Sequence, residues 1–463
     1  MTTGPAPQPP SPTPAKLTLT DALSSARETR ALVVGRGVVR EAARVFADQF
    51  PGATAVVVAD PTTQRVAGES VIAALRAAGI ASESPFLFTD PGLYAEFRFV
   101  AQLEASLRTH GAIPIAVGSG TINDLVKLAA HRTGRPGYLC VATAASMDGY
   151  TAFGASITFE GAKQTFNCPA PRAVVADLDI IGRAPPDMTA SGYADLLAKV
   201  PAGADWILAD ALSVEPVEAR AWAIVQGGLR DALADPAGAR AGRPTAIAPL
   251  VEGLMLGGFA MQWSKSSRPA SGAEHQFSHL WDMEHHTHQG AAPSHGFKVG
   301  VATHAVSRFY ERLLARDLQS LDVDAAVARW SSAEVNGEAV LRARFAGTDF
   351  VATAVAETQA KQIAPAALRE QLHRLQAGWP QTRARLQGQL LPAAEVKRRL
   401  ELVGAPSEPE QIGISRARLR DTFVRAYHIR RRFTVLDVAV RAGLRDALLD
   451  ELFGPGAPWD VRC

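Results

Sequence analysis

Short runs of β-branched and small apolar residues alternate with helix-like segments through the first 180 residues of the chain. Segments such as 62–78 and 94–109 place Val, Ala, Leu and Phe at helical spacing. Strands that alternate with helices are typical of a parallel sheet, because each parallel connection needs a crossover of a dozen or more residues. We therefore expect a doubly wound α/β domain over residues 17–180, with helices covering its sheet. The expected strands are 31–35, 54–60, 113–118, 138–143 and 173–178.

The character of the chain changes after residue 178. Strand-like runs stop, and segments rich in Ala, Leu, Arg and Glu follow, including 216–234, 326–345 and 365–378. We expect an all-helical second domain over residues 181–463, since 463 residues exceed what one hydrophobic core usually serves. The cleft between two such domains is where small-molecule sites usually form.

Two further segments bear on the cellular setting of the protein. Residues 1–16 are rich in Pro, Thr and Ser and predict a disordered tail rather than a signal peptide or anchor. The most apolar stretch, 244–264, contains Glu252, two prolines and several glycines, so it predicts a buried helix rather than a membrane span.

Composition excludes several classes of partner. The chain carries 48 basic and 46 acidic residues, a formal charge of +2, which gives no global field for nucleic acid or an anionic membrane. The basic stretch Arg416 to Arg432 favours a solvated or subunit-contacting helix over a nucleic-acid contact. Three scattered cysteines, Cys140, Cys168 and Cys463, form no disulfide framework and fit a reducing cytoplasm.

Seven of the eleven histidines fall between His275 and His304. Imidazole is the commonest protein ligand for divalent metals, and the i, i+4 pair His275 and His279 would share one face of a helix. This spacing predicts a metal site. Three more histidines lie in a polar run that could equally be a solvated loop: His285, His286 and His288.

Glycines and one aspartate follow the expected strands. Gly118-Ser-Gly120 comes directly after a strand and opens a helix, where backbone amides and a positive helix end can approach a phosphate. Gly35-Arg-Gly37 is a second such instance, so the pattern alone is weak evidence. Asp60 either contacts the ribose of a dinucleotide, which would favour NAD over NADP, or caps the helix that starts at Pro61; both alternatives remain open.

Five segments follow one another along the chain: GSGTIND at 118–124, TAASMDGYT at 143–151, GYADLLAK at 192–199, SGAEHQFSH at 271–279 and HGFKVG at 295–300. Together they resemble the sn-glycerol-1-phosphate dehydrogenase family, in its bacterial, arabinose-operon form. That family belongs to the group of dehydroquinate synthases, glycerol dehydrogenases and iron-containing alcohol dehydrogenases, which pairs an N-terminal nucleotide-binding domain with a helical metal-binding domain. The likeness runs from about Thr29 to His304 and resumes over 426–437.

The resemblance implies a metal site and substrate contacts. One divalent metal ion would be held by Asp195, His275 and His295, a donor set that suits zinc first and nickel or iron as alternatives. Asp195, Asp148 and His279 would contact the substrate, and Asp148 and His279 would relay a proton. His285, His286, His288 and His304 would then be bystanders.

The resemblance also implies a binding site for NAD(H) or NADP(H), with contacts beyond that of Asp60. A serine of the family is Ala152 here, with Thr151 beside it as a substitute hydroxyl, and Gly-Ser-Gly replaces a triple glycine. The implied contacts are Gly118, Ser119, Gly120, Thr121, Ile122, Thr143, Ala144, Ala145 and Ser146.

The implied activity is hydride transfer at C2, interconverting dihydroxyacetone phosphate and sn-glycerol 1-phosphate, in a cytoplasmic homodimer. The phosphate needs a cation, and Lys163, Lys199, Arg268 and Lys298 are the candidates in or near the motifs. A glycerol or polyol dehydrogenase and a dehydroquinate synthase-like enzyme are alternatives within the group. An inactive relative that serves as a binding module is the alternative from another class.

Overall fold

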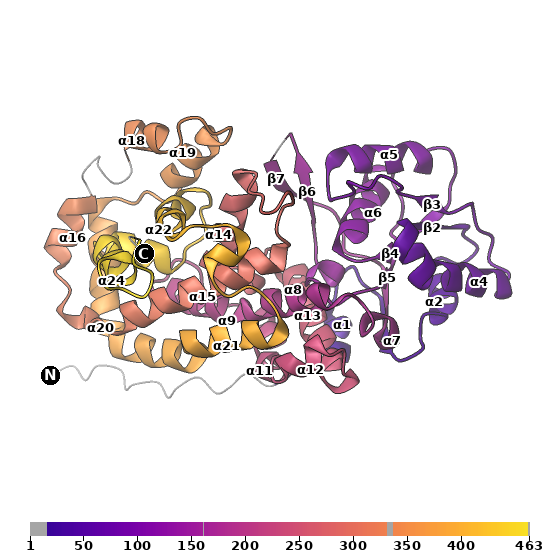
Figure 1. Cartoon of the computed structure of the whole chain (residues 1–463), viewed down its shortest axis with the longest axis horizontal. Coiled ribbons are helices and arrows are strands. Elements are labelled where there is room, and N and C mark those ends of the chain that lie inside the picture. Colours follow the sequence, from indigo (N-terminus) through magenta and orange to yellow (C-terminus); the bar gives the residue numbers. More distant parts are fainter. Residues whose placement is uncertain (1–15, 161, 331–336, 462–463) are drawn as a thin grey trace.

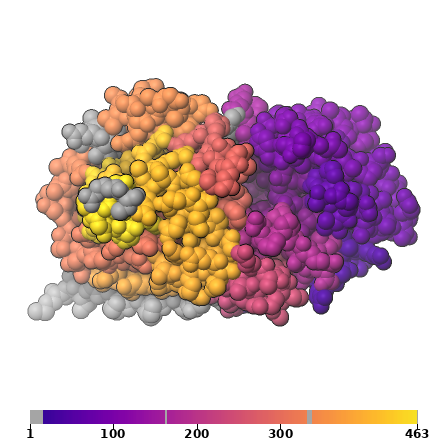
Figure 2. Space-filling model, viewed as in Figure 1, coloured from indigo at the N-terminus to yellow at the C-terminus, as the bar shows by residue number. Residues whose placement is uncertain are grey.

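The computed structural model describes residues 16–160, 162–330 and 337–461. Figure 1 shows two lobes, an α/β lobe formed by the indigo and purple part of the chain and a helical lobe formed by the magenta to yellow part. On the face drawn in Figure 2 the surface is hollowed where the two lobes meet. The expected tail at 1–16 lies, except for Lys16, outside the described residues.

A six-stranded parallel sheet forms the α/β lobe, in the order β1-β8-β5-β4-β2-β3. All five expected strands are present, which confirms the predicted parallel sheet. The sequence did not indicate β3, because two residues are too short for a period-2 pattern. The strands are β1 (Ala31–Gly35), β2 (Ala55–Ala59), β3 (Phe86–Leu87), β4 (Ile113–Gly118), β5 (Leu139–Ala142) and β8 (Ala173–Asp177).

Helices cover both faces of this sheet. Along β2, Val56 and Val58 pack into one hydrophobic cluster while Val57 and its neighbours pack into another, because successive side chains of a strand point to opposite faces. Helices α5 (Phe97–Leu107) and α6 (Gly120–Arg132) lie in the first cluster. Helices α2 (Glu41–Gln49) and α4 (Glu69–Ala77) lie in the second, and α4 follows α3 (Pro61–Thr63) and a π-helical turn, η1 (Gln64–Gly68).

An antiparallel hairpin, β6 (Ala155–Phe159) and β7 (Ala162–Phe166), projects beside the main sheet, where the sequence predicted no strands. It follows a short 3-10 turn, η2 (Gly149–Thr151). Strand β7 reaches α14 of the helical lobe. Tertiary packing, and not the local pattern of residues, therefore stabilises this hairpin.

The rest of the described chain is helical, as the sequence predicted. Helix α13, the most apolar segment, is long and apolar enough to cross a membrane by composition, but most of it is buried in the protein. The helices are α7 (Leu178–Ile181), α8 (Pro186–Leu197), α9 (Lys199–Ala211), α10 (Ala219–Gln226), α11 (Leu229–Ala232), α12 (Pro236–Arg240), α13 (Pro244–Ser264), η3 (Arg268–Ala270), α14 (Ala273–Met283), α15 (His295–Leu314), η4 (Leu318–Ser320), α16 (Val323–Trp330), α18 (Glu338–Arg344), α19 (Val351–Gln359), α20 (Pro365–Gln389), α21 (Ala393–Val403), η5 (Pro409–Ile412), α22 (Arg416–Arg425), η6 (Ala426–His428), α23 (Val435–Arg441) and α24 (Arg445–Phe453).

The two lobes share a core. One cluster of buried residues runs from Leu125 of the α/β lobe to Tyr193 and Leu250 of the helical lobe. The N-terminal helix α1 (Leu19–Ser25) packs against α13 of the helical lobe, although it precedes the first strand. The expected boundary near residue 180 agrees with the end of the sheet and stays a prediction as a domain limit.

Candidate metal and nucleotide site

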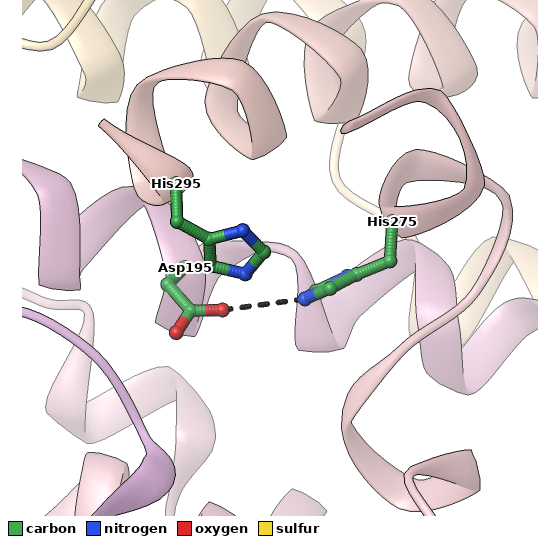
Figure 3. A group of neighbouring side chains, drawn as sticks. All are labelled: Asp195, His275 and His295. Carbon is green, nitrogen blue, oxygen red and sulfur yellow. Dashed lines mark ion pairs between the residues drawn. The ribbon is translucent and has the colours of Figure 1, made fainter. Parts of the chain in front are cut away.

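Three helices bring Asp195, His275 and His295 together. Asp195 lies near the end of α8, His275 in the first turn of α14, and His295 at the first position of α15. One ligand atom from each lies within 4.8 Å of the others. Asp195 Oδ1 is 3.5 Å from His275 Nε2, and Figure 3 shows the three side chains directed at one another. A carboxylate and two imidazoles at this spacing suit one transition-metal ion.

Two glycines let the ligand-bearing helices approach each other. A Cβ on Gly192 of α8 would lie 2.0 Å from the carbonyl oxygen of Ala145, in the loop after β5. A Cβ on Gly296 of α15 would lie 1.9 Å from the carbonyl oxygen of Ser191. Neither distance is possible for a real Cβ, so only glycine allows α8 to touch both the nucleotide-side loop and the start of α15.

Glu274 orients one of the imidazoles. Its Oε1 lies 2.8 Å from His275 Nδ1 and also accepts a hydrogen bond from the Gly272 amide at 2.6 Å. This leaves His275 Nε2 facing Asp195, as a metal ligand requires. Burial lowers the pKa of His275, but the hydrogen bonds to Asp195 and Glu274 outweigh it and leave the pKa above its ordinary value. Glu274 was not predicted from the sequence, although an acidic residue next to the proposed ligand His275 was the available signal.

Lys199 lies between the carboxylate of Asp195, a proposed metal ligand, and the carboxylate of Asp148, which is proposed to contact the substrate. Its Nζ lies 2.7 Å from Asp148 Oδ2 and 2.8 Å from Asp195 Oδ1. Burial would raise the pKa of Asp195, but the Lys199 charge and the His275 hydrogen bond hold it below its usual range. Burial and the Asp195 charge raise the pKa of Asp148. Asp148 is therefore the carboxyl of this pair that takes up a proton first.

His279 lies next to the three ligand residues but outside them. Its ring centroid is 6.4 Å from that of His275 and 6.3 Å from that of His295. The other histidines of the cluster contact different parts of the protein: His286 Nε2 is 2.7 Å from Ile412 O, His304 Nδ1 is 2.8 Å from Ser407 O, His285 lies 3.6 Å from Asp349, and the His288 side chain lies against Gly413. These positions fit their interpretation as bystanders.

The predicted dinucleotide segments lie at the carboxyl edge of the sheet. Strand β4 ends at Gly118 and α6 begins at Gly120. Strands β4 and β2 are neighbours in the sheet, and the chain leaves them toward opposite edges, to β5 and to β3. Ligands of open α/β sheets bind at such a point. A Cβ on Gly118 would lie 2.6 Å from the Ile122 side chain, so the tight turn needs glycine. The Thr143 amide donates to Gly118 O and places segment 143–146 beside this turn.

Asp60 caps helix α3. Its Oδ1 accepts hydrogen bonds from the amides of Thr62 and Thr63, at 2.7 and 3.0 Å. The capping alternative is therefore present in the structure, and the ribose contact stays a prediction. The hydroxyl of Thr151, the expected substitute for the family serine at position 152, is fully buried and donates to Met255 O.

Of the candidate phosphate cations, three already have partners. Lys199 bridges two carboxylates, Lys298 pairs with Asp282, and Arg268 donates to the carbonyls of Asp205 and Phe433. The side chain of Lys163 lies outside the described residues. The structure thus brings Asp148, Asp195, His275, His279 and His295 together, while Lys199, Lys298 and Arg268 each already contact other groups of the protein.

The helical lobe supplies an aspartate and two histidines beside an α/β lobe, and residues 33–185 of the chain match the family model described as iron-containing alcohol dehydrogenase. Structures of a glycerol dehydrogenase from Schizosaccharomyces pombe (TM-score 0.56, 15% identity, 91% of this chain and 90% of that chain) and an NADH-dependent butanol dehydrogenase from Thermotoga maritima (TM-score 0.56, 14% identity, 90% and 96%) share the fold.

Relatives in sequence identify a narrower family. Proteins named glycerol-1-phosphate dehydrogenase [NAD(P)+] are 35% identical in Halalkalibacterium halodurans, over 57% of this chain and 66% of the relative. Those from Bacillus subtilis and Methanosarcina mazei are 34% and 35% identical, over 57% and 59% of this chain and 67% and 74% of the relatives. The chain belongs to the glycerol-1-phosphate dehydrogenase family, which confirms the resemblance and the predicted fold.

Proposed function

We propose that this protein interconverts dihydroxyacetone phosphate and sn-glycerol 1-phosphate by NAD(P)-linked hydride transfer at C2. The observation that carries the proposal is the convergence of Asp195, His275 and His295 beside Asp148 and His279. The family membership supports the same substrate. A dinucleotide at the Gly118–Ile122 turn would present its nicotinamide from the α/β side.

Asp195, His275 and His295 would hold one divalent ion, for which zinc is the first candidate and iron and nickel are alternatives. A metal ion in this position supplies Lewis acidity, which stabilises negative charge on the C2 oxygen. Glu274 fixes the tautomer of His275, and Lys199 keeps Asp195 ionised and positions Asp148. The protein thus prepares an anionic ligand set before substrate binds.

The proton has two candidate carriers. Reduction of the carbonyl needs one proton on the C2 oxygen in addition to the hydride. Asp148 has a raised pKa and is held by a single lysine, so its carboxyl can be protonated at the site. His279 lies one turn after His275 on α14, and an imidazole can both donate and accept a proton. We propose that these two residues bind the substrate hydroxyl and deliver the proton.

The alternative functions differ in what they require of the site. The glycerol dehydrogenase structures share the fold at 15–17% identity, which does not identify a substrate. A dehydroquinate synthase-like enzyme would use the same ligand set with bound NAD. An inactive relative would need no intact ligand set, whereas all three ligand positions are kept here. The cytoplasmic location and the homodimer remain part of the proposal, and light scattering tests the dimer.

One assay separates these functions. The purified protein is loaded with zinc and mixed with NADH or NADPH and either dihydroxyacetone phosphate or dihydroxyacetone, and oxidation is followed at the nicotinamide absorbance. We expect turnover with the phosphate and much weaker turnover with the free triose. An enzyme specific for one glycerol phosphate enantiomer identifies the product. Turnover with dihydroxyacetone alone would identify a polyol dehydrogenase instead.

A further inference from the structure

Three arginines gather at the start of the helix that carries His275. They are Arg268 in η3 and two residues of the segment after η6, Arg430 and Arg432. Arg432 Nη2 donates to the hydroxyl oxygen of Ser267 at 3.0 Å, and Arg430 Nη2 lies 3.5 Å from the same atom. Arg432 Nη1 donates to the carbonyl and hydroxyl oxygens of Ser271, at 2.6 and 2.8 Å. Two guanidinium groups therefore converge on one hydroxyl.

The positive charge of this cluster is not balanced. Arg268 pairs with Glu215 at 3.3 Å, but no carboxylate of the described chain lies within 4.0 Å of the guanidinium of Arg430 or Arg432. Each guanidinium has five N–H donors, and Arg430 uses one of them in a long contact. Burial, followed by the charges of Arg430 and Arg268, holds the pKa of Arg432 well below its usual range.

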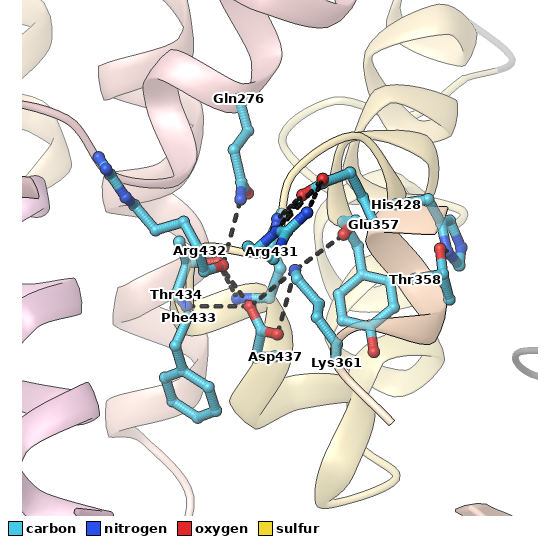
Figure 4. A network of polar contacts seen from close by, with 12 residues as sticks. Gln276, Glu357, Thr358, Lys361, His428, Arg431, Arg432, Phe433, Thr434 and Asp437 are labelled. Atoms are coloured by element: carbon cyan, nitrogen blue, oxygen red, sulfur yellow. Dashed lines mark hydrogen bonds and ion pairs between the residues drawn. The ribbon is translucent and has the colours of Figure 1, made fainter. Parts of the chain in front are cut away.

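Arg431, between these two residues, behaves differently. Its guanidinium is exposed and binds both carboxylate oxygens of Glu357, with the shortest contact at 2.7 Å. Figure 4 shows Arg431 directed at Glu357 and Lys361 directed at Asp437. The three consecutive arginines thus divide into one that is paired with a carboxylate and two that are not. The unpaired two share the Ser267 hydroxyl.

The cluster is adjacent to the proposed metal site. Ser271, which accepts from Arg432, precedes His275 by four residues, and the Arg432 carbonyl oxygen accepts from Gln276 Nε2 at 3.4 Å, on the residue after His275. Glu274 is close enough to act on the pKa of Arg432. Arg430 and Arg432 are partly exposed, whereas Arg268 is 2% exposed. A ligand can therefore reach the first two from solvent.

We infer that Arg430 and Arg432, together with the Ser267 and Ser271 hydroxyls, bind the phosphate group of the substrate. The inference rests on the proposed function, since it assigns the phosphate end of the same substrate. A phosphate dianion would neutralise the two guanidinium groups and accept their remaining N–H donors in the forked geometry that arginine provides. Arg268, at the base of the cluster, contributes charge and holds the loop of Phe433.

Three variants test this subsite: Arg432→Gln, Arg430→Gln and, as the matched control, Arg431→Gln. The first two should raise the KM for dihydroxyacetone phosphate about 10- to 100-fold, as expected for a lost charge-assisted contact. In Arg430→Gln, which loses only one long contact, the kcat/KM for dihydroxyacetone, the zinc content and the unfolding temperature should change little. Arg431→Gln should leave the KM for the phosphate unchanged. Arg430→Gln keeps the test valid if Arg432→Gln disturbs the Ser271 loop, since Arg430 makes only one weak contact.

Inorganic phosphate serves as a direct probe. Calorimetric titration of the zinc-loaded wild type should show binding that both variants weaken and the control does not. If wild type binds phosphate in this way but does not turn over dihydroxyacetone phosphate, the proposed function fails while the anion site stands. Equal losses with the phosphorylated and free triose would show that the arginines only position α14, and would overturn the inference. Unchanged KM and phosphate binding in both variants would also overturn it.

Discussion

His275 Nδ1 lies 2.8 Å from Oε1 of Glu274, the residue immediately before it on α14. Because this contact fixes which imidazole nitrogen faces Asp195, we expect Glu274→Gln to weaken zinc binding about 10- to 100-fold, the usual effect of losing the partner of a histidine ligand. Competition with a chromophoric chelator measures the affinity. His285→Gln is the control, because His285 follows α14 and is largely exposed; a similar loss in both variants would contradict the role of Glu274.

Metal binding should depend on pH through His275. Its pKa is raised above the ordinary value of about 6.5, and a protonated imidazole cannot bind a metal. As the pH is lowered, zinc affinity should therefore begin to fall while the pH is still above 6.5. Below the pKa of His275 it should drop about tenfold per pH unit. Zinc titrations between pH 5.5 and 8.5 test this. In Glu274→Gln the fall should begin at lower pH, because one of the hydrogen bonds that raises the pKa is gone. An affinity that does not change over this range would contradict the prediction.

Lys199→Met should destabilise the metal-free protein. The substitution leaves Asp148 and Asp195 buried next to each other without their shared cation, and removing one partner of a buried ion pair costs about 3–5 kcal/mol. Urea unfolding at pH 7 measures the loss. At pH 5 the loss should be smaller, since protonation of Asp148, whose pKa is already raised, relieves the repulsion. Lys397→Met, in a partly exposed pair with Glu408, is the control.

Gly192→Ala should disturb both the site and the fold. The added Cβ would collide with the carbonyl oxygen of Ala145, which cannot move without shifting the nucleotide-side loop. We expect a loss of at least about 1–3 kcal/mol in unfolding free energy and weaker binding of NADH. Gly388→Ala is the control, because Gly388 lies within helix α20 with no atom within 4 Å of the added Cβ, and it should be neutral or stabilise by up to about 1 kcal/mol. Equal stability of the two variants would contradict the close packing of α8.

Lys361 and Asp437 form a second buried pair, 3.1 Å apart, outside the site. Burial lowers the pKa of Lys361, although Asp437 opposes the shift. Lys361→Met should lower the free energy of unfolding by about 3–5 kcal/mol, since Asp437 would remain buried with an uncompensated charge. Zinc affinity, measured with the same chelator, should stay unchanged. A loss of zinc binding would show that this pair also holds the metal site in place.

The sequence alone was sufficient to predict the α/β lobe, in which strands alternate with helices. Strands β1, β2, β4, β5 and β8 are runs of buried apolar residues, and a run of this kind is visible without any knowledge of its neighbours. Strand β3 and the β6–β7 hairpin were missed, because contacts with distant parts of the chain stabilise them. The ordered motifs likewise indicated the family, and with it the ligand positions.

Only the tertiary structure decided how the individual side chains pair. From sequence, Lys199 was a candidate for the phosphate, yet in the structure it is buried between Asp148 and Asp195. Arg430 and Arg432 were part of a basic stretch predicted to be a solvated or subunit-contacting helix, yet they follow η6 outside any helix and lie beside the first turn of α14, about 160 residues earlier in the chain. Residue type determines what a side chain can bind, but the partner it meets depends on long-range packing. For that reason the sequence determined the class of chemistry, and the fold decided which charges are neutralised and which remain for a ligand.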